Sequence, residues 1–141
     1  MHILFIHQNF PAQFRYLAPH LVNEYGWKCT FATAKAEGTL PGVEKVVYTC
    51  KGGATKANHV CTRNFENTVW EAHSVYELLK QRPDVQPDLI VAHTGFGSSL
   101  FLPFLYDAPI INFLEMFYSP THVGTIPLNF YLCLFAGYDS P

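Results

Sequence analysis

The chain has 141 residues, of which 49% are hydrophobic and 14% are charged, and this composition suits one globular domain with a substantial core. Its formal net charge is −2, and its nine Lys and Arg residues form no basic cluster along the sequence. Binding to nucleic acid needs several cations on one face, so the sequence argues against a nucleic-acid partner.

Short apolar runs, each bounded by turn-forming residues, recur along the chain. The first is continuous and apolar, which is typical of a strand covered on both faces. Between these runs lie segments whose apolar residues recur at helical spacing, and segments without periodicity that are typical of loops. In total the sequence predicts five strands, at residues 2–6, 27–33, 43–49, 88–93 and 109–115.

Helices are predicted in three of the intervals between these strands. In the interval 11–25, Pro19 lacks the amide N–H that a helix interior needs, so we expect a kink there or a main helix that begins near Ala18. The longest helix follows Thr62, a candidate N-cap. A short helix is predicted within 97–106. One face of the longest helix is apolar and carries Phe65, Val69, Ala72, Tyr76 and Leu79.

Strands that alternate with helices favour a mostly parallel sheet with right-handed crossovers, and therefore a doubly wound α/β fold in three layers. In the usual strand order 3-2-1-4-5, ligands bind beyond the carboxyl ends of the strands, where the order reverses between the first and fourth strands. A histidine stands at the end of both strands. The residues expected to converge at this edge are His7, Gln8, Asn9, His93, Thr94 and Glu115.

The loop after the fourth strand adds Gly95 and Gly97, which permit a tight turn and a close approach of a ligand to backbone amides. The plain alternative is that a histidine at a strand end only caps neighbouring carbonyls, and the sequence leaves both interpretations open. The chain has no GxGxxG after its first strand, no GxxxxGK[ST] and no GxSxG. Dinucleotide-binding, P-loop and α/β-hydrolase functions therefore lose their main support.

The four cysteines include no CxxC pair and no zinc-type spacing. We expect reduced thiols in a cytoplasmic protein, and no metal site. The first residues lack the pattern of a secretory signal peptide. The most apolar stretch, 126–136, is shorter than the roughly 20 residues that a membrane-spanning helix needs.

Several of these segments resemble the amino-terminal domain of bacterial glycosyltransferases of family 4, in the retaining GT-B class. The likeness extends over residues 2–118 and is most specific in HQNFPAQF (7–14) and HTGFGSSLFL (93–102). It implies a Rossmann-like domain that forms the amino-terminal half of a GT-B fold. The other matching segments are PGVEKVVYT (41–49), NFENTVWEAHSVYELL (64–79) and APIINFLEMFY (108–118).

The resemblance also implies a function, which is transfer of a hexose from a UDP- or GDP-sugar to an unknown acceptor. The nucleotide sugar would be a substrate, and no tightly bound cofactor is expected. By this likeness His93 faces the transferred sugar as the catalytic residue. The implied donor contacts are His7, Gln8, Asn9, Phe10, Thr94, Gly95, Gly97 and Glu115.

The likeness divides the chain into residues 1–118, the glycosyltransferase domain, and 119–141, a divergent apolar tail that packs on the same domain or on a partner. Family members carry two glutamates eight positions apart in a carboxyl-terminal, donor-binding domain, and no glutamates here have that spacing. We therefore expect that domain as a missing partner, without which the chain is inactive. Homodimer formation through 119–136 is predicted, and peripheral contact with a membrane is left open. The rival functions are a nucleotide- or sugar-binding module and a self-associating remnant, both without catalysis.

Overall fold

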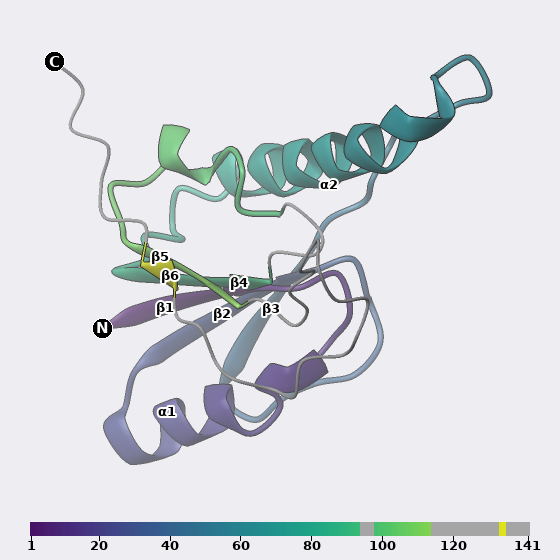
Figure 1. Cartoon of the computed structure of the whole chain (residues 1–141). Coiled ribbons are helices and arrows are strands. Elements are labelled where there is room, and N and C mark those ends of the chain that lie inside the picture. Colours follow the sequence, from purple (N-terminus) through teal and green to yellow (C-terminus); the bar gives the residue numbers. More distant parts are fainter. Residues whose placement is uncertain (94–97, 114–132, 135–141) are drawn as a thin grey trace, which may run out of the picture.

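The computed structural model describes residues 1–93, 98–113 and 133–134, and its centre is a six-stranded sheet (Figure 1). The strand order is β3-β2-β1-β4-β5-β6, and β1 to β5 are parallel, whereas β6 pairs with β5 in the antiparallel sense. The predicted order 3-2-1-4-5 is confirmed. The strands are β1 (His2–Ile6), β2 (Lys28–Thr33), β3 (Val43–Val47), β4 (Leu89–His93), β5 (Ile110–Phe113) and β6 (Cys133–Leu134).

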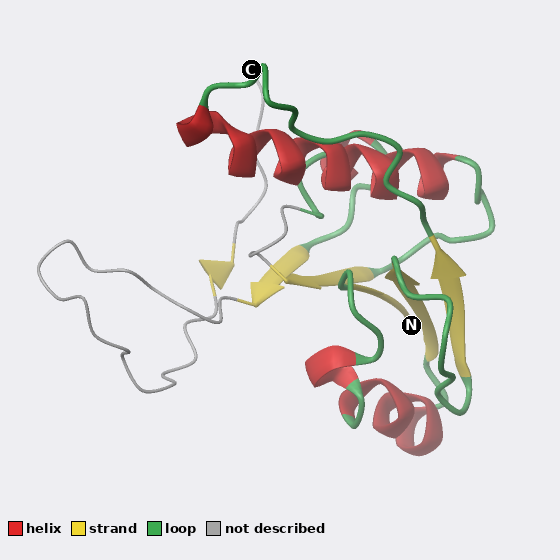
Figure 2. Ribbon diagram, turned by 90° about the vertical axis from the view of Figure 1, so that its right-hand side faces the viewer, coloured by secondary structure: helices red, strands yellow, loops and turns green. Residues whose placement is uncertain are grey.

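Helices cover both faces of the sheet, so the predicted three-layer α/β fold is confirmed (Figure 2). Every residue of β1 is buried, and alternate side chains enter different cores because successive residues of a strand point to opposite faces. Ile3 and Phe5 pack in the core beneath α1 (Leu17–Tyr25). Leu4 and Ile6 pack in the core beneath α2 (Arg63–Lys80).

The structure decides between the two expectations for Pro19 in favour of the later helix start. A short 3-10 helix, η1 (Ala12–Phe14), comes first, and α1 then begins at Leu17. Pro19 therefore lies in the first turn of α1, where a backbone N–H has no helical partner to lose. The helix ends at Tyr25, and its C-cap is Gly26, which has φ +63° and whose N–H donates to the carbonyl oxygens of Leu21 and Val22.

The long helix α2 follows the 3-10 helix η2 (Val60–Thr62), and the predicted helix start after Thr62 is confirmed. Thr62 occupies the N-cap position, but its hydroxyl donates to the carbonyl of His59 at 2.9 Å and caps no amide of α2. Phe65 is 68% exposed, although it shares the apolar face. The cause is visible in Figure 1, because the first turns of α2 extend past the carboxyl ends of the strands and have no sheet beneath them.

Residues 98–106 are less helical than their sequence suggests. Within residues 98–106, the described part of the predicted helix, only the 3-10 helix η4 (Leu102–Phe104) forms. The two-residue strand β6 was not predicted, because a strand this short shows no periodicity. Most of the predicted tail, 119–141, lies outside the described residues.

At the amino-terminal edge of the sheet, the buried ring of His2 joins three segments that are distant in sequence. Its Nε2 lies 2.8 Å from the Thr30 hydroxyl, and its Nδ1 lies 3.0 Å from the carbonyl oxygen of Gln86. The backbone N–H of His2 donates to the Asp88 carboxylate at 2.6 Å. Burial, followed by the Lys28 ammonium, lowers the pKa of His2 below its usual 6.5.

This burial predicts a loss of stability in mild acid. The unfolded chain protonates His2 as the pH falls below about 6.5, whereas the folded chain resists that proton, so the free energy of unfolding decreases over this interval. Urea midpoints at pH 7.5 and pH 5.0 measure the decrease. His2→Gln should make it smaller, and His20→Gln, a change at an exposed position on α1, should leave it unaltered. An equal decrease in all three proteins would contradict the expectation.

Candidate functional site at the carboxyl edge of the sheet

The ends of β1 and β4 bring two histidines together. Ile6 pairs with Ala92 in the parallel register of these strands, so the residues that follow leave the sheet side by side. The ring centroids of His7 and His93 are 4.9 Å apart with an interplanar angle of 70°. Both side chains are buried, at 5% and 3% exposure. The strand order thus produces the meeting of imidazoles that the sequence predicts.

His7 also organises the turn that follows it. Its Nδ1 accepts the backbone N–H of Asn9 at 2.9 Å, so the neutral ring carries its proton on Nε2 and presents a donor there. Its own N–H donates to the carbonyl of Ala32 at 3.1 Å and extends the ladder between β1 and β2. The ring of His7 therefore caps a backbone amide, whereas the plain alternative expected it to cap carbonyls.

The backbone of the loop after β1 is fixed to the end of β2. The carbonyl of Gln8 accepts the Thr33 hydroxyl at 2.9 Å and the Ala34 N–H at 3.1 Å. The Phe10–Pro11 peptide bond is cis. The side chain of Asn9 is exposed and that of Gln8 is partly exposed. Polar side chains therefore face outward from a backbone that is already held in place.

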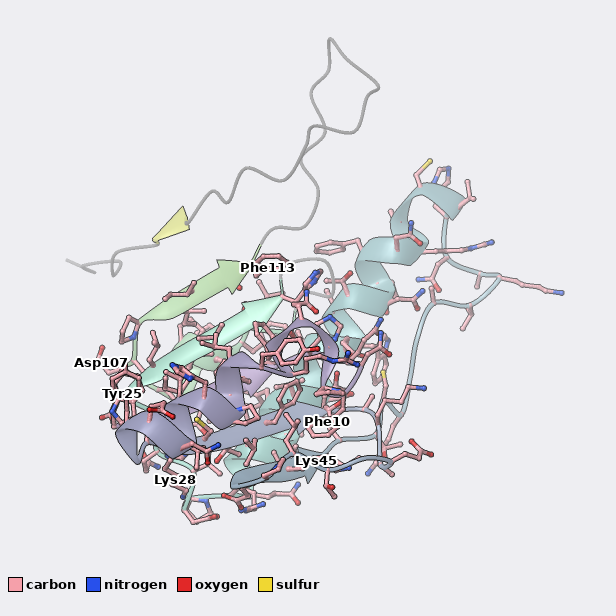
Figure 3. All side chains as sticks on the ribbon, turned by 90° about the horizontal axis from the view of Figure 1, so that it is seen from below. Phe10, Tyr25, Lys28, Lys45, Asp107 and Phe113 are labelled. Carbon is pink, nitrogen blue, oxygen red and sulfur yellow. The ribbon has the colours of Figure 1, made fainter. Side chains whose placement is uncertain are left out.

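The side chain of Phe10 packs against an aromatic ring and a lysine ammonium of the same chain (Figure 3). Its ring meets the edge of Phe31 at a centroid distance of 4.9 Å, and the Lys45 ammonium lies 4.8 Å from its centroid. The same ammonium donates to the carbonyl of Glu37 at 3.0 Å and to the carbonyls of Ala36 and Gly38. A cation over an aromatic face stabilises both groups. These contacts connect the first loop to β3 and to the loop after β2.

The opposite side of the edge is formed by β5 and the turn after β4. The Ser99 hydroxyl donates to Asn112 Oδ1 at 2.9 Å, and Asn112 pairs with Ala92 across the sheet. The ring of Phe113 lies 5.7 Å from that of His93. Of the site residues expected from sequence, Thr94, Gly95, Gly97 and Glu115 lie outside the described residues.

A sequence model of the glycosyl transferase family 4 group matches residues 25–125. The chain belongs to this family. Among solved structures it is similar to CalG4, the calicheamicin glycosyltransferase, with a TM-score of 0.49 and 18% sequence identity. The match covers 87% of this chain and 34% of that one, so the chain spans about a third of the length of CalG4. A search of curated proteins found no match.

Sequence reasoning missed three residues at this edge of the family 4 domain. Thr33 anchors the first loop, Asn112 bonds to the turn after β4, and Phe113 packs against His93. The signal for Asn112 was present in the sequence, because it is the single polar residue in the otherwise apolar strand Ile110–Phe113. Thr33 and Phe113 are typical strand residues and carried no such signal.

A hollow of about 450 Å³ lies between the segment that follows β3 and one face of α2. Its lining includes Trp70, His73 and Glu77 from α2 and Lys51 from the loop. This volume is in the range of small-molecule sites in proteins.

Within the described residues of this family 4 domain, no group of three or more His, Cys, Asp or Glu is placed to hold a metal ion. No helix in that part of the chain has the length and apolar content to cross a bilayer.

Proposed function

We propose that the chain is the acceptor-side, amino-terminal domain of a retaining enzyme that transfers a hexose from a UDP- or GDP-sugar to an acceptor. The observation that carries this proposal is the pair of buried imidazoles, His7 and His93, at the carboxyl edge of a family 4 domain. Ligands of doubly wound sheets bind at this position. The enzyme would use its nucleotide sugar in the cytoplasm.

The proposed reaction breaks the bond between the anomeric carbon and the diphosphate and forms one to the acceptor oxygen, with retained configuration. Its transition state has an oxocarbenium-like carbon and a departing diphosphate. In the proposal His93 donates a hydrogen bond to the transferred sugar, and His7 and Asn9 lie toward the donor's phosphate. Buried donors that are already in place stabilise developing charge better than water does.

The hydrogen-bonding side chains at the described edge are those of His7, Asn9, His93, Ser99 and Asn112, and the Lys45 ammonium beside Phe10 already donates to three backbone carbonyls. The departing diphosphate carries negative charge that they do not balance. We therefore place the balancing cations in a second, carboxyl-terminal domain that binds most of the donor. The acceptor would bind to the amino-terminal domain described above, where the hollow lined by Trp70 and Glu77 lies beside the end of β3.

The test compares two proteins, which are the polypeptide encoded by the whole gene and the 141-residue chain. Each is incubated with UDP- and GDP-hexoses, and release of UDP or GDP is measured with and without cell extract as an acceptor source. We expect release from one donor by the longer polypeptide and none by the 141-residue chain. No release by the longer polypeptide with any donor would overturn the proposal. Thermal stabilisation of the short chain by a nucleotide sugar, together with that result, would favour a binding module.

A further inference from the structure

Lys45 is a charged side chain on the face of the sheet that α1 covers. It pairs with Phe31 in the parallel register of β2 and β3, and Phe31 is buried in the core on that face. Val43, two residues earlier on the same face of β3, packs against the same core. None of the ion pairs in the described part of the chain includes Lys45. A cation without a carboxylate partner at such a position needs other polar groups around it.

Backbone carbonyls of the loop after β2 supply those groups. The Lys45 ammonium donates to the carbonyl of Glu37 at 3.0 Å and to the carbonyls of Ala36 and Gly38. A lysine ammonium has three N–H donors, so these three bonds use all of them. Lys45 therefore has no N–H left for the diphosphate of a nucleotide sugar.

The ring of Phe10 is the fourth group that the Lys45 ammonium contacts (Figure 3). The nitrogen lies 4.8 Å from the ring centroid. Gly38 lies against the same ring, because a Cβ at Gly38 would be 3.4 Å from Phe10 Cδ1. Gly38 has φ +78°, a conformation that other residues rarely adopt. The turn 36–38 therefore folds back onto Phe10, and Lys45 bonds to the turn and contacts the ring at the same time.

These contacts give the loop after β1 a second point of attachment. The first is the carbonyl of Gln8, which is bonded to the end of β2. Asn9 stands between Gln8 and Phe10, and its backbone N–H donates to His7 Nδ1. The side chain of Asn9 is exposed. A side chain that projects from a backbone fixed on both sides loses little conformational entropy when it binds a ligand.

We propose that Lys45 is a positioning residue for the nucleotide-sugar donor, and that through it the turn 36–38 supports the donor side of the site. This inference rests on the proposed function, in which His7 and Asn9 lie toward the donor's phosphate. Lys45 keeps Phe10 in place, and Phe10 fixes the loop from which Asn9 projects. The ammonium does not itself touch the donor. Without it the turn and Phe10 move independently, and the loop adopts orientations that do not fit the donor.

Hydrogen exchange of the 141-residue chain tests the anchoring without any donor. The backbone N–H groups of Asn9 and Ala34 are both hydrogen-bonded at this edge of the sheet. In Lys45→Met both should exchange about tenfold faster, because the loops open more often. The N–H of Gly26, bonded at the end of α1, should exchange at the wild-type rate. Unchanged exchange at Asn9, or an equal acceleration at Gly26, would overturn the proposal.

Lys80→Met is the matched control for this experiment. The Lys80 ammonium lies 5.6 Å from the ring centroid of Tyr76 on α2, so this variant also removes a cation from an aromatic ring. Exchange at residues 9 and 34 should equal that of the wild type. Residues 36–38 are exposed, so in Lys45→Met their carbonyls bond to water and the protein should remain folded. Melting temperatures of both variants check this.

Kinetics of the polypeptide encoded by the whole gene test the consequence for the donor. Lys45→Met should raise KM for the donor about tenfold and change kcat less than about twofold, because a misplaced loop weakens ground-state and transition-state binding alike. A residue that only stabilises the fold would lower the apparent kcat and leave KM unchanged. In a Phe10→Leu background, Lys45→Met should raise KM little further, since the two side chains act together. Fully additive effects on KM would contradict action through Phe10.

The two experiments separate this inference from the proposed function. Unchanged KM in Lys45→Met, measured on an active polypeptide, would overturn the role of Lys45 and leave the transfer reaction standing. If the wild-type polypeptide releases no UDP or GDP from any donor, the proposed function fails. Exchange at Asn9 would then still decide whether Lys45 anchors the loop after β1.

Discussion

Replacement of His93 with alanine is expected to lower kcat/KM for the proposed hexose transfer roughly a hundredfold in a polypeptide that carries both proposed domains. His93 ends β4 beside His7, and only 3% of it is exposed. A hydrogen bond from this ring to the sugar would strengthen as the anomeric carbon becomes positive, so its loss should reduce kcat more than it raises KM. Initial rates over a range of donor concentrations separate the two effects.

Two further variants make this result specific. His93→Gln keeps a donor at the end of β4 and should recover part of the lost rate. His20→Ala removes an exposed imidazole on α1 and should leave the rate unchanged. Melting temperatures of all variants show whether the fold is intact. If His93→Ala turns over donor within twofold of the wild type while it remains folded, His93 has no part in the reaction.

The meeting of His7 and His93 could be predicted from sequence for a definite physical reason. Short apolar runs that are buried on both faces identify parallel strands, and right-handed crossovers leave few orders in which to arrange them. The first and fourth strands are then neighbours, and each ends in a histidine. Prediction succeeds here because it needs only strand identity and order, and not the conformation of any loop.

Contacts that depend on loop conformation could not be predicted in this way. The Lys45 ammonium reaches three carbonyls of the nearby loop after β2 and also the ring of Phe10, which lies far away along the chain. Periodicity likewise placed Phe65 on the correct face of α2 but could not reveal that the helix extends beyond the sheet. A pattern shows which way a side chain faces, whereas burial also depends on what lies opposite.

The aromatic core beneath the first loop gives the largest expected effect on stability. Phe31 is 0% exposed, and its ring lies 4.9 Å from Phe10, 6.1 Å from Phe14 and 6.2 Å from Phe5. Phe31→Ala should lower the free energy of unfolding by about 3–5 kcal/mol, because it removes these contacts and leaves a cavity. Urea denaturation measures the change, and Phe104→Ala, at an exposed position, should stay within about 0.5 kcal/mol of the wild type.

A milder substitution of Phe31 tests whether the loop after β1 depends on the aromatic core. A domain of this size is stable by only about 5–15 kcal/mol. Phe31→Leu, expected to cost about 1–2 kcal/mol, therefore keeps a folded protein available for measurement. Because Phe31 supports Phe10, hydrogen exchange of the amides at residues 8–10 should become faster in Phe31→Leu. Unchanged exchange there would mean that the bonds from Thr33 and Ala34 to Gln8 alone hold the loop, independently of the aromatic core.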